Sequence, residues 1–169
     1  LIEVFSSSTC GPCAPANATF KTLMDAQVAG DYNYIKYQMN WPGTGDPYFT
    51  AEALAKRTLY GVNSVPKAQI DGGWNGHAGQ ITQNILNGFK SKPSFMNLSG
   101  YYTVDAAAQK VDMNIDISPL VTTSKSLSLQ VAIYEKSTTQ NVKSNGETVF
   151  YNVMKKLIPD ASGTALTNL

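Results

Sequence analysis

Two cysteines near the start of the chain are the residues best suited to chemistry. Cys10 and Cys13 are the only cysteines, and they flank Gly11 and Pro12 in the sequence Cys-Gly-Pro-Cys. A mainly apolar segment precedes this motif and a helix-like segment follows it, so the first thiol is expected at a helix N-terminus. Free N–H groups and the helix dipole favour a thiolate there, and thiol pKa values fall from about 8.5 to roughly 3.5–7.5 at such positions. Cys10 is therefore interpreted as the attacking thiol and Cys13 as the resolving thiol.

Three other roles for the cysteine pair compete with this interpretation. A structural disulfide between Cys10 and Cys13 would close too short a loop to constrain the unfolded chain strongly. A structural zinc site needs about four ligands, whereas the chain offers two cysteines and His77, so no metal site is expected. An inactive, vestigial motif stays open as an alternative. No cofactor is expected other than the redox-active Cys10–Cys13 pair itself.

Composition excludes several classes of partner. The 169 residues are 43% hydrophobic, and 13 Lys and Arg nearly balance 12 Asp and Glu. Without a strongly basic surface, neither nucleic acid nor an anionic membrane is expected as a partner. No run of about 18 apolar residues occurs, so no transmembrane segment is expected. The sequence begins inside an apparent strand, so we expect any export signal or lipid anchor to lie outside it.

The first half of the chain has the pattern of an α/β domain. Strands are predicted over 1–5, 32–40 and 67–70, and helices over 11–30 and 46–61. Asp46 is expected to cap the second helix, with Pro47 in its first turn.

The second half reads differently, because residues alternate with period 2 and Ser, Thr, Asn and Gly separate the alternating runs. We therefore predict an α/β domain over 1–93 followed by an all-β domain over 97–169, an antiparallel sheet or sandwich that is incomplete in this sequence. The carboxylates of this half are expected on the solvated face of the sheet, and this half is expected to bind or position rather than catalyse. They are Asp105, Asp112, Asp116, Glu135, Glu147 and Asp160.

About fifty residues after the cysteines, the sequence Tyr-Gly-Val-Asn-Ser-Val-Pro ends at Pro66. This motif and Cys-Gly-Pro-Cys, in this order and spacing, resemble the thioredoxin-like superfamily over 1–93. The resemblance implies a cis-proline at Pro66 against the cysteine pair, and a Val65 backbone that hydrogen-bonds an extended substrate peptide. It also implies a last helix over about 78–90. Gly11 and Pro12 are expected to set the turn between the cysteines and, with Val65, to bind the substrate.

The sequence departs from the thioredoxin pattern at the buried acid. The aspartate of that family, which helps to deprotonate the resolving thiol, falls at Val4, and Glu3 is expected on the opposite face of the strand. Lys36 resembles a lysine that partners this aspartate in the family, but in the absence of the aspartate Lys36 is expected to be a solvated strand residue. The tryptophan before the first cysteine is replaced by Thr9.

Further motifs are Cys-x-x-Cys-x-Pro, Asp46-Pro47, Val-Pro before a strand, and, in the β-rich half, the runs Ala-Ile-Tyr-Glu and Val-Met-Lys-Lys-Leu-Ile-Pro. Together with the order of the two domains, they resemble a family of exported Gram-negative outer-membrane-associated proteins. This second resemblance implies a location in the periplasm or at the outer membrane or cell surface, often through a lipid anchor.

Two functions follow from these observations. The first is a thiol–disulfide oxidoreductase that acts on protein disulfides and depends on an unknown redox partner for recycling. The alternative is a cell-surface or outer-membrane binding module, adhesin-like, on a redox-inactive thioredoxin scaffold. A peroxide-reducing enzyme fits less well, because Arg57 is the only arginine available to such a site.

Overall fold

The computed structural model describes residues 1–167. The chain forms two compact units. The main unit consists of residues 1–91 and 130–164, and the hairpin unit consists of residues 92–129 and those from Ala165 onward. Each unit is described by itself.

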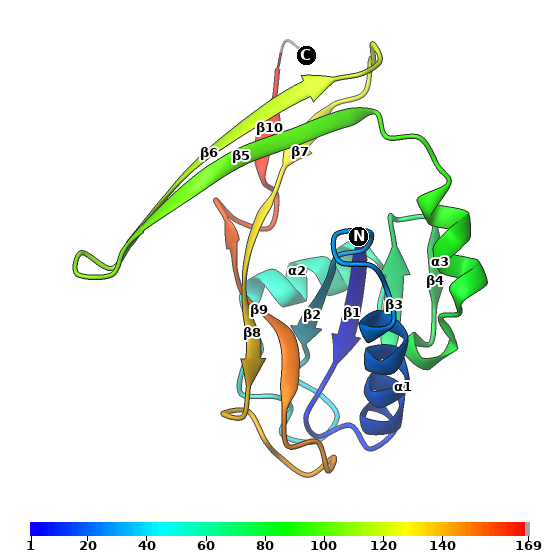
Figure 1. Cartoon of the computed structure of the whole chain (residues 1–169). Helices are drawn as coiled ribbons and strands as arrows, with labels where there is room; N and C mark the ends of the chain where they lie inside the picture. Colours follow the sequence, from blue (N-terminus) through cyan, green and yellow to red (C-terminus); the bar gives the residue numbers. More distant parts are fainter. Residues whose placement is uncertain (168–169) are drawn as a thin grey trace. The chain divides into compact units, whose positions relative to one another are not determined.

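A six-stranded mixed sheet, in the order β4-β3-β1-β2-β9-β8, forms the centre of the main unit (Figure 1). Its strands are β1 (Ile2–Ser6), β2 (Tyr34–Gln38), β3 (Lys67–Ile70), β4 (Trp74–Gly76), β8 (Val131–Thr138) and β9 (Phe150–Ile158). Strand β2 runs parallel to both β1 and β9, whereas β3 is antiparallel to β1 and β8 is antiparallel to β9.

Helices cover both faces of this sheet, because the central strands carry apolar side chains on both sides. One face packs Ile2 and Val4 against α1 (Cys13–Asp25), the short 3-10 helix η1 (Ala78–Gln80) and α3 (Gln83–Lys90). The other face packs Phe5, Ile35 and Tyr37 against α2 (Ala51–Leu59) and β9. The two faces of β1 and β2 therefore lie in different cores.

The predicted succession of an α/β thioredoxin-like domain and a separate all-β domain is wrong. Strands β8 and β9 belong to the second half of the sequence, yet β9 pairs with β2 and completes the sheet of the first half. Met154 and Leu157 of β9 are each 1% exposed and lie in the same core as Phe5 and Tyr37. An alternating pattern predicts strands and their buried face, but it does not say which sheet they join.

The hairpin unit contains the long antiparallel pair β5 (Met96–Asp105) and β6 (Lys110–Pro119), together with β7 (Leu127–Leu129). Strand β7 pairs with β10 (Thr164–Leu166), which begins at the last residue of the main unit. The strands predicted around residues 101–104 and 111–117 are thus present.

All three expected helices begin later than the sequence indicated. The one expected over 78–90 is divided into η1 and α3, and α3 begins at Gln83. Helix α1 begins at Cys13, with Pro12 at the N-cap position and no side-chain cap. Helix α2 begins at Ala51, where the Thr50 hydroxyl accepts a hydrogen bond from the Ala53 N–H. Asp46 is therefore not the cap of this helix, and its carboxylate has a different role.

Candidate redox site

Cys10 and Cys13 form a disulfide in the turn that leads from β1 into α1, with their Cα atoms 5.3 Å apart. The Cys10 N–H donates to the Ser7 carbonyl, and the Cys13 N–H donates to the Cys10 carbonyl, both at 3.0 Å. Cys10 is 2% exposed and Cys13 is fully buried, whereas Gly11 and Pro12 between them are exposed. Access to the disulfide is therefore from the side of Cys10 and the exposed turn.

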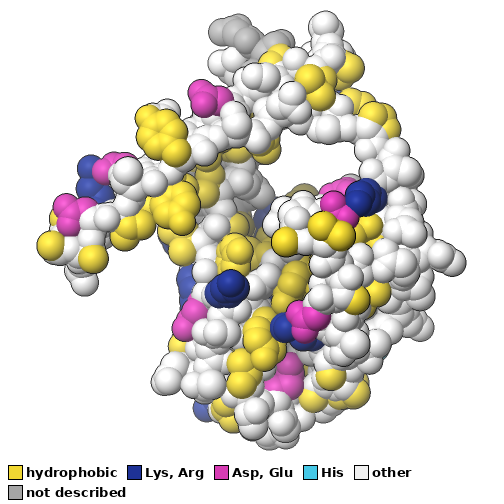
Figure 2. All heavy atoms as spheres, in the orientation of Figure 1, with side chains coloured by type: hydrophobic (Ala, Val, Ile, Leu, Met, Phe, Trp, Pro, Cys, Tyr) yellow, Lys and Arg dark blue, Asp and Glu magenta, His cyan; other side chains and the backbone are white. Residues whose placement is uncertain are grey.

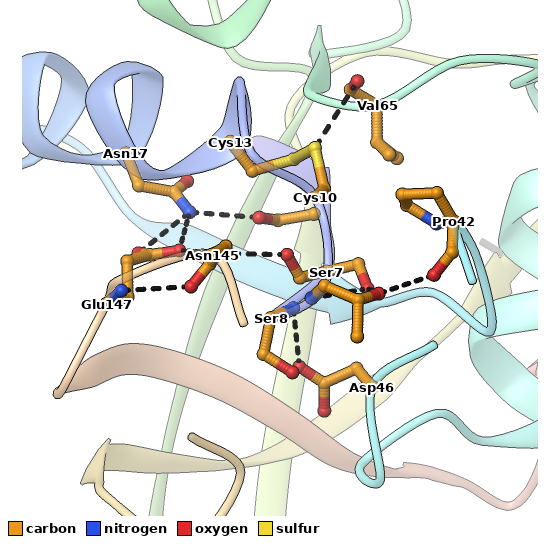
Figure 3. Close-up of a disulfide and its surroundings, with 12 residues drawn as sticks. Ser7, Ser8, Cys10, Cys13, Asn17, Pro42, Asp46, Val65, Asn145 and Glu147 are labelled. Carbon is orange, nitrogen blue, oxygen red and sulfur yellow. Dashed lines mark hydrogen bonds between the residues drawn. A yellow bond between two sulfur atoms is a disulfide. The ribbon is translucent and has the colours of Figure 1, made fainter. Parts of the chain in front are cut away.

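The two predicted motifs meet at Cys10. Its Sγ lies 3.6 Å from the carbonyl oxygen of Val65, as Figure 3 shows. The Val65–Pro66 peptide bond is cis, and Pro66 is buried while Val65 is half-buried. Cys10, Cys13 and Val65, 55 residues from Cys10 along the chain, thus form one site.

Helix α1 presents its N-terminus to this site. Because the helix begins at Cys13, Cys10 lies in the turn before it rather than within its first turn. Pro15 carries no N–H, so the helix offers fewer unpaired donors than an ordinary N-terminus. The dipole of a 13-residue helix still favours negative charge at this end.

A buried carboxylate fixes the loop before the disulfide. Asp46 is 5% exposed, and its Oδ2 accepts hydrogen bonds from the Ser8 N–H and from the Asn141 side-chain amide, each at 3.0 Å. Its Oδ1 accepts from the Tyr48 N–H at 2.8 Å. Gly45, at φ +71°, lies so close to the backbone of Asn40 that any side chain there would collide with it. This tight turn places Asp46 beside residues 7–9, the segment before Cys10, which we call the redox loop.

The loop between β8 and β9 also contacts the redox loop, and the sequence did not predict this contact. The Asn145 N–H donates to the Ser8 carbonyl at 2.9 Å, and its side-chain amide donates to the Ser7 carbonyl at 3.1 Å. Three buried polar atoms around the redox loop have no hydrogen-bond partner within the described chain: Ser8 Oγ, Asn17 Oδ1 and Asn141 Oδ1. Polar atoms left unsatisfied in this way are uncommon in protein interiors.

A buried lysine and a carboxylate lie beside the cysteine-bearing helix. Lys36 of β2 is 1% exposed, so the expectation that it is solvated is wrong. Burial lowers its pKa to about 8, although Glu147 favours the charged form. No ion pair or hydrogen bond of the Lys36 ammonium occurs in residues 1–167. Burial also raises the pKa of Glu147, against the opposing effect of Lys36.

Asn17, one turn after Cys13 on α1, links this pair to the redox loop. Its amide lies 2.9 Å from the Ser6 hydroxyl and 2.9 and 3.0 Å from the two carboxylate oxygens of Glu147. Figure 3 shows Asn17 between Glu147 and the cysteine pair. A cavity of about 300 Å³ adjoins this network, and Asn17, Lys36 and Glu147 are among its lining residues.

Glu147 was predicted to be solvated, and that prediction is wrong. It lies beside Lys36 on the α1 face of the sheet. Lys36 pairs with Val4 across β1 and β2, and Val4 is the position at which the aspartate of the thioredoxin pattern falls. Only the insertion of β9 beside β2 brings Glu147 there. Nothing in the local sequence around residue 147 signals this placement.

A second buried ionic cluster lies on the opposite face of the sheet. Glu3 accepts hydrogen bonds from the Tyr37 hydroxyl at 2.8 Å and from the Tyr60 hydroxyl, and its Oε1 lies 3.4 Å from the Lys56 ammonium. Lys56 also donates to Gln130 at 2.5 Å. Burial and the Glu3 charge together raise the pKa of both tyrosines. Glu3 thus faces away from the cysteines, as predicted.

Comparisons with known proteins give a fold but no function. No protein-family model matches the sequence, and no curated protein matches it significantly. The crystal structure of protein AGR_C_4864 from Agrobacterium tumefaciens is similar, with a TM-score of 0.68 and 19% sequence identity, over 98% of this chain and 74% of that one. At this identity the likeness concerns the fold alone.

Within residues 1–167, no helix is long and apolar enough to cross a membrane. The same residues contain no cluster of three or more His, Cys, Asp or Glu side chains suited to hold a metal ion.

Proposed function

We propose that this protein is a thiol–disulfide oxidoreductase of the thioredoxin-like kind, with Cys10 and Cys13 as its redox pair. The observation that carries the proposal is the disulfide at the start of α1, with Cys10 Sγ 3.6 Å from the Val65 carbonyl. A two-residue spacing, an adjoining helix N-terminus and a facing backbone segment are the features that a reversible exchange site needs.

In the oxidised protein, a client thiolate attacks Sγ of Cys10 and the bond between the two cysteines breaks. A mixed disulfide forms, and Cys13 leaves as a thiolate that takes up a proton. A second client thiolate then attacks the client sulfur of the mixed disulfide, so Cys10 leaves, and the client gains a disulfide while the protein gains two thiols. The reverse sequence reduces a client disulfide. Cys10 is assigned the exchanging role because Cys13 is fully buried.

The Val65 backbone is proposed to pair with the client chain as the mixed disulfide forms. Gly11 and Pro12 are exposed and leave room for the client beside Cys10. Pro66, which is buried next to Val65, shapes this side of the site. The expected partners are protein thiols and disulfides, together with a redox protein that recycles the pair.

Glu147 and Lys36 are proposed to hold the proton that the resolving thiol exchanges. Glu147 accepts hydrogen bonds from the amide of Asn17, one helical turn from Cys13, and Lys36 lines the same cavity. Burial raises the pKa of Glu147 and lowers that of Lys36. A group whose pKa lies near the working pH transfers protons most effectively. We further propose that the protein is exported and works in an oxidising compartment, where a partner protein returns the cysteine pair to its starting redox state after each reaction.

The proposal is tested by the reduction of insulin with dithiothreitol. The wild-type protein should accelerate the reaction, and Cys10→Ser should not. Cys13→Ser should instead accumulate a mixed disulfide through Cys10, visible by mass spectrometry as an adduct that excess dithiothreitol removes. Equal rates for the wild type and Cys10→Ser would refute the proposal.

Burial of the disulfide favours a second candidate function. With Cys10 only 2% exposed, the bond is as protected as a permanent one. The chain would then be a binding module on a redox-inactive scaffold, adhesin-like and at the cell surface. A disulfide that stays intact under the conditions of the insulin assay would favour this candidate.

A further inference from the structure

The hairpin formed by β5 and β6 is amphipathic along its whole length. Its ten cross-strand pairs alternate strictly between the two faces of the strand pair. One face carries the pairs Met96–Pro119, Leu98–Ile117, Gly100–Ile115, Tyr102–Met113 and Val104–Val111. We call this the apolar face of the hairpin.

Most side chains of this face are exposed, and only Met96 and Ile117 are half-buried. Leu98, Tyr102 and Val104 are 62%, 70% and 62% exposed, and Val111 and Met113 are 49% and 41% exposed. Figure 2 shows hydrophobic side chains along the hairpin. An isolated two-stranded hairpin is at best marginally stable in water, and a large contiguous apolar patch marks an interaction site.

The opposite face carries every charge of the two strands. Asp105, Lys110, Asp112 and Asp116 all belong to pairs on that face, which therefore has a net negative charge. Two copies that met through this polar face would repel each other, whereas two apolar faces bring no like charges together. The pattern selects the apolar face as the self-complementary one.

The size of the apolar face suits a dimer. With ten residues in each strand, a rise of about 3.4 Å per residue and a strand spacing of about 4.8 Å give a face roughly 34 Å long and 10 Å wide. Protruding side chains raise its accessible surface to roughly 500–700 Å², so two facing copies bury roughly 1,000–1,400 Å². This area reaches the lower end of specific protein interfaces.

We propose that the apolar face of the hairpin binds the same face of a second copy of this chain. A two-fold axis near Gly100 and Ile115, the middle pair of the five, lets each half of one face meet the other half of its partner. The contact does not involve the cysteine pair, so the dimer is expected whether or not the redox proposal holds.

Neighbouring tyrosines provide a matched test. Tyr102 lies on the apolar face and Tyr101 on the polar face, and they are 70% and 66% exposed. In sedimentation velocity, the wild-type protein should form a dimer with a Kd on the order of 10 µM, and Tyr102→Lys should weaken it at least tenfold. Tyr101→Lys should change the Kd by less than about twofold. Ile115→Lys and Asn114→Lys provide a second matched pair on β6.

The folding of each variant is checked independently of the hairpin, because both tryptophans, Trp41 and Trp74, lie in the main unit and report on it by fluorescence. Amide hydrogen exchange supplies a second readout, since protection over 96–105 and 110–119 should rise with wild-type concentration. A wild-type protein that stays monomeric at about 300 µM would overturn the proposal. Equal weakening by Tyr101→Lys and Tyr102→Lys, or hairpin protection independent of concentration, would also overturn it.

Discussion

The two faces of the central sheet each bury a lysine and a glutamate, but the two pairs differ in how completely they are satisfied. Glu3 has three partners, and its lysine, Lys56, has a second acceptor in Gln130. Lys36 lines a cavity, where the charge of Glu147 favours its protonated form and that of Lys21 opposes it. Every ionised group of the first pair thus has a hydrogen-bond or ion-pair partner, whereas burial lowers the pKa of Lys36 to about 8 and raises the pKa of Glu147. The second lies beside the cysteine-bearing helix, where a proton must move.

The largest effect is expected when the satisfied cluster is broken. Glu3→Ala leaves two tyrosine hydroxyls without their acceptor and the buried Lys56 ammonium without its counter-ion, with only Gln130 as an acceptor, which should cost about 3–5 kcal/mol in the free energy of unfolding. Urea denaturation measures this loss. The matched control is Asp112→Ala, at an exposed ion pair with Lys110, where a change of at most about 1 kcal/mol is expected. Similar losses in both variants would show that the Glu3 cluster contributes no more to the free energy of unfolding than an exposed ion pair does.

The unsatisfied pair should give a pH-dependent effect of the opposite sign. The pKa of Lys36 is about 8 in the folded chain and ordinarily 10.5. Between these values the unfolded chain holds the extra proton, so the free energy of unfolding should rise with pH by about 3 kcal/mol in total. Below pH 8 Lys36 is protonated in the folded chain, so the burial of its cation lowers the free energy of unfolding by the full amount.

Lys36→Met should remove this rise and stabilise the protein at pH 7 by about 1–3 kcal/mol, because an apolar side chain carries no desolvation penalty. The difference between wild-type and variant profiles isolates Lys36 from the tyrosines that titrate above pH 10. Lys143→Met, at an exposed lysine in the β8–β9 loop, serves as the control and should leave the profile unchanged. Parallel profiles for the wild type and Lys36→Met would contradict the account.

A smaller effect, on rate rather than stability, is expected at Glu147. Glu147→Gln keeps an acceptor for Asn17 but cannot exchange a proton, so resolution of the mixed disulfide should slow by about tenfold or more. Its pH–rate profile should also lose one titration step. Stopped-flow mixing with a thiol client measures both. Glu135→Gln, at a surface ion pair with Lys155, should behave like the wild type, and an unchanged profile for Glu147→Gln would assign the proton elsewhere.

The contrast also separates what the sequence predicts from what it does not. Cys10 and Cys13 are recognisable because their relation is local, and the alternation of β1 correctly places Glu3 away from Val4. Glu147 and Asn145 reach the site only because β9 pairs with β2, more than a hundred residues away. Such a pairing depends on tertiary packing, since an alternating strand fits equally well in several sheets.

Asp46 gives the same lesson on a shorter scale. The Asp-Pro sequence is a common helix start, so a capping role was predicted. The buried loop around Ser8 supplies stronger partners for the carboxylate, and the helix instead begins after Thr50. Long-range hydrogen bonds thus override a local signal.

The central claim, that the Cys10–Cys13 bond exchanges reversibly with thiols, is tested most directly by its reduction potential. The protein is equilibrated in glutathione and dithiothreitol buffers of graded potential, the free thiols are alkylated, and the reduced fraction is read by mass. We expect one reversible two-electron transition between about −120 and −270 mV, the range of exchange catalysts. A bond that stays oxidised in buffers below about −300 mV would be a structural disulfide, and would contradict the account.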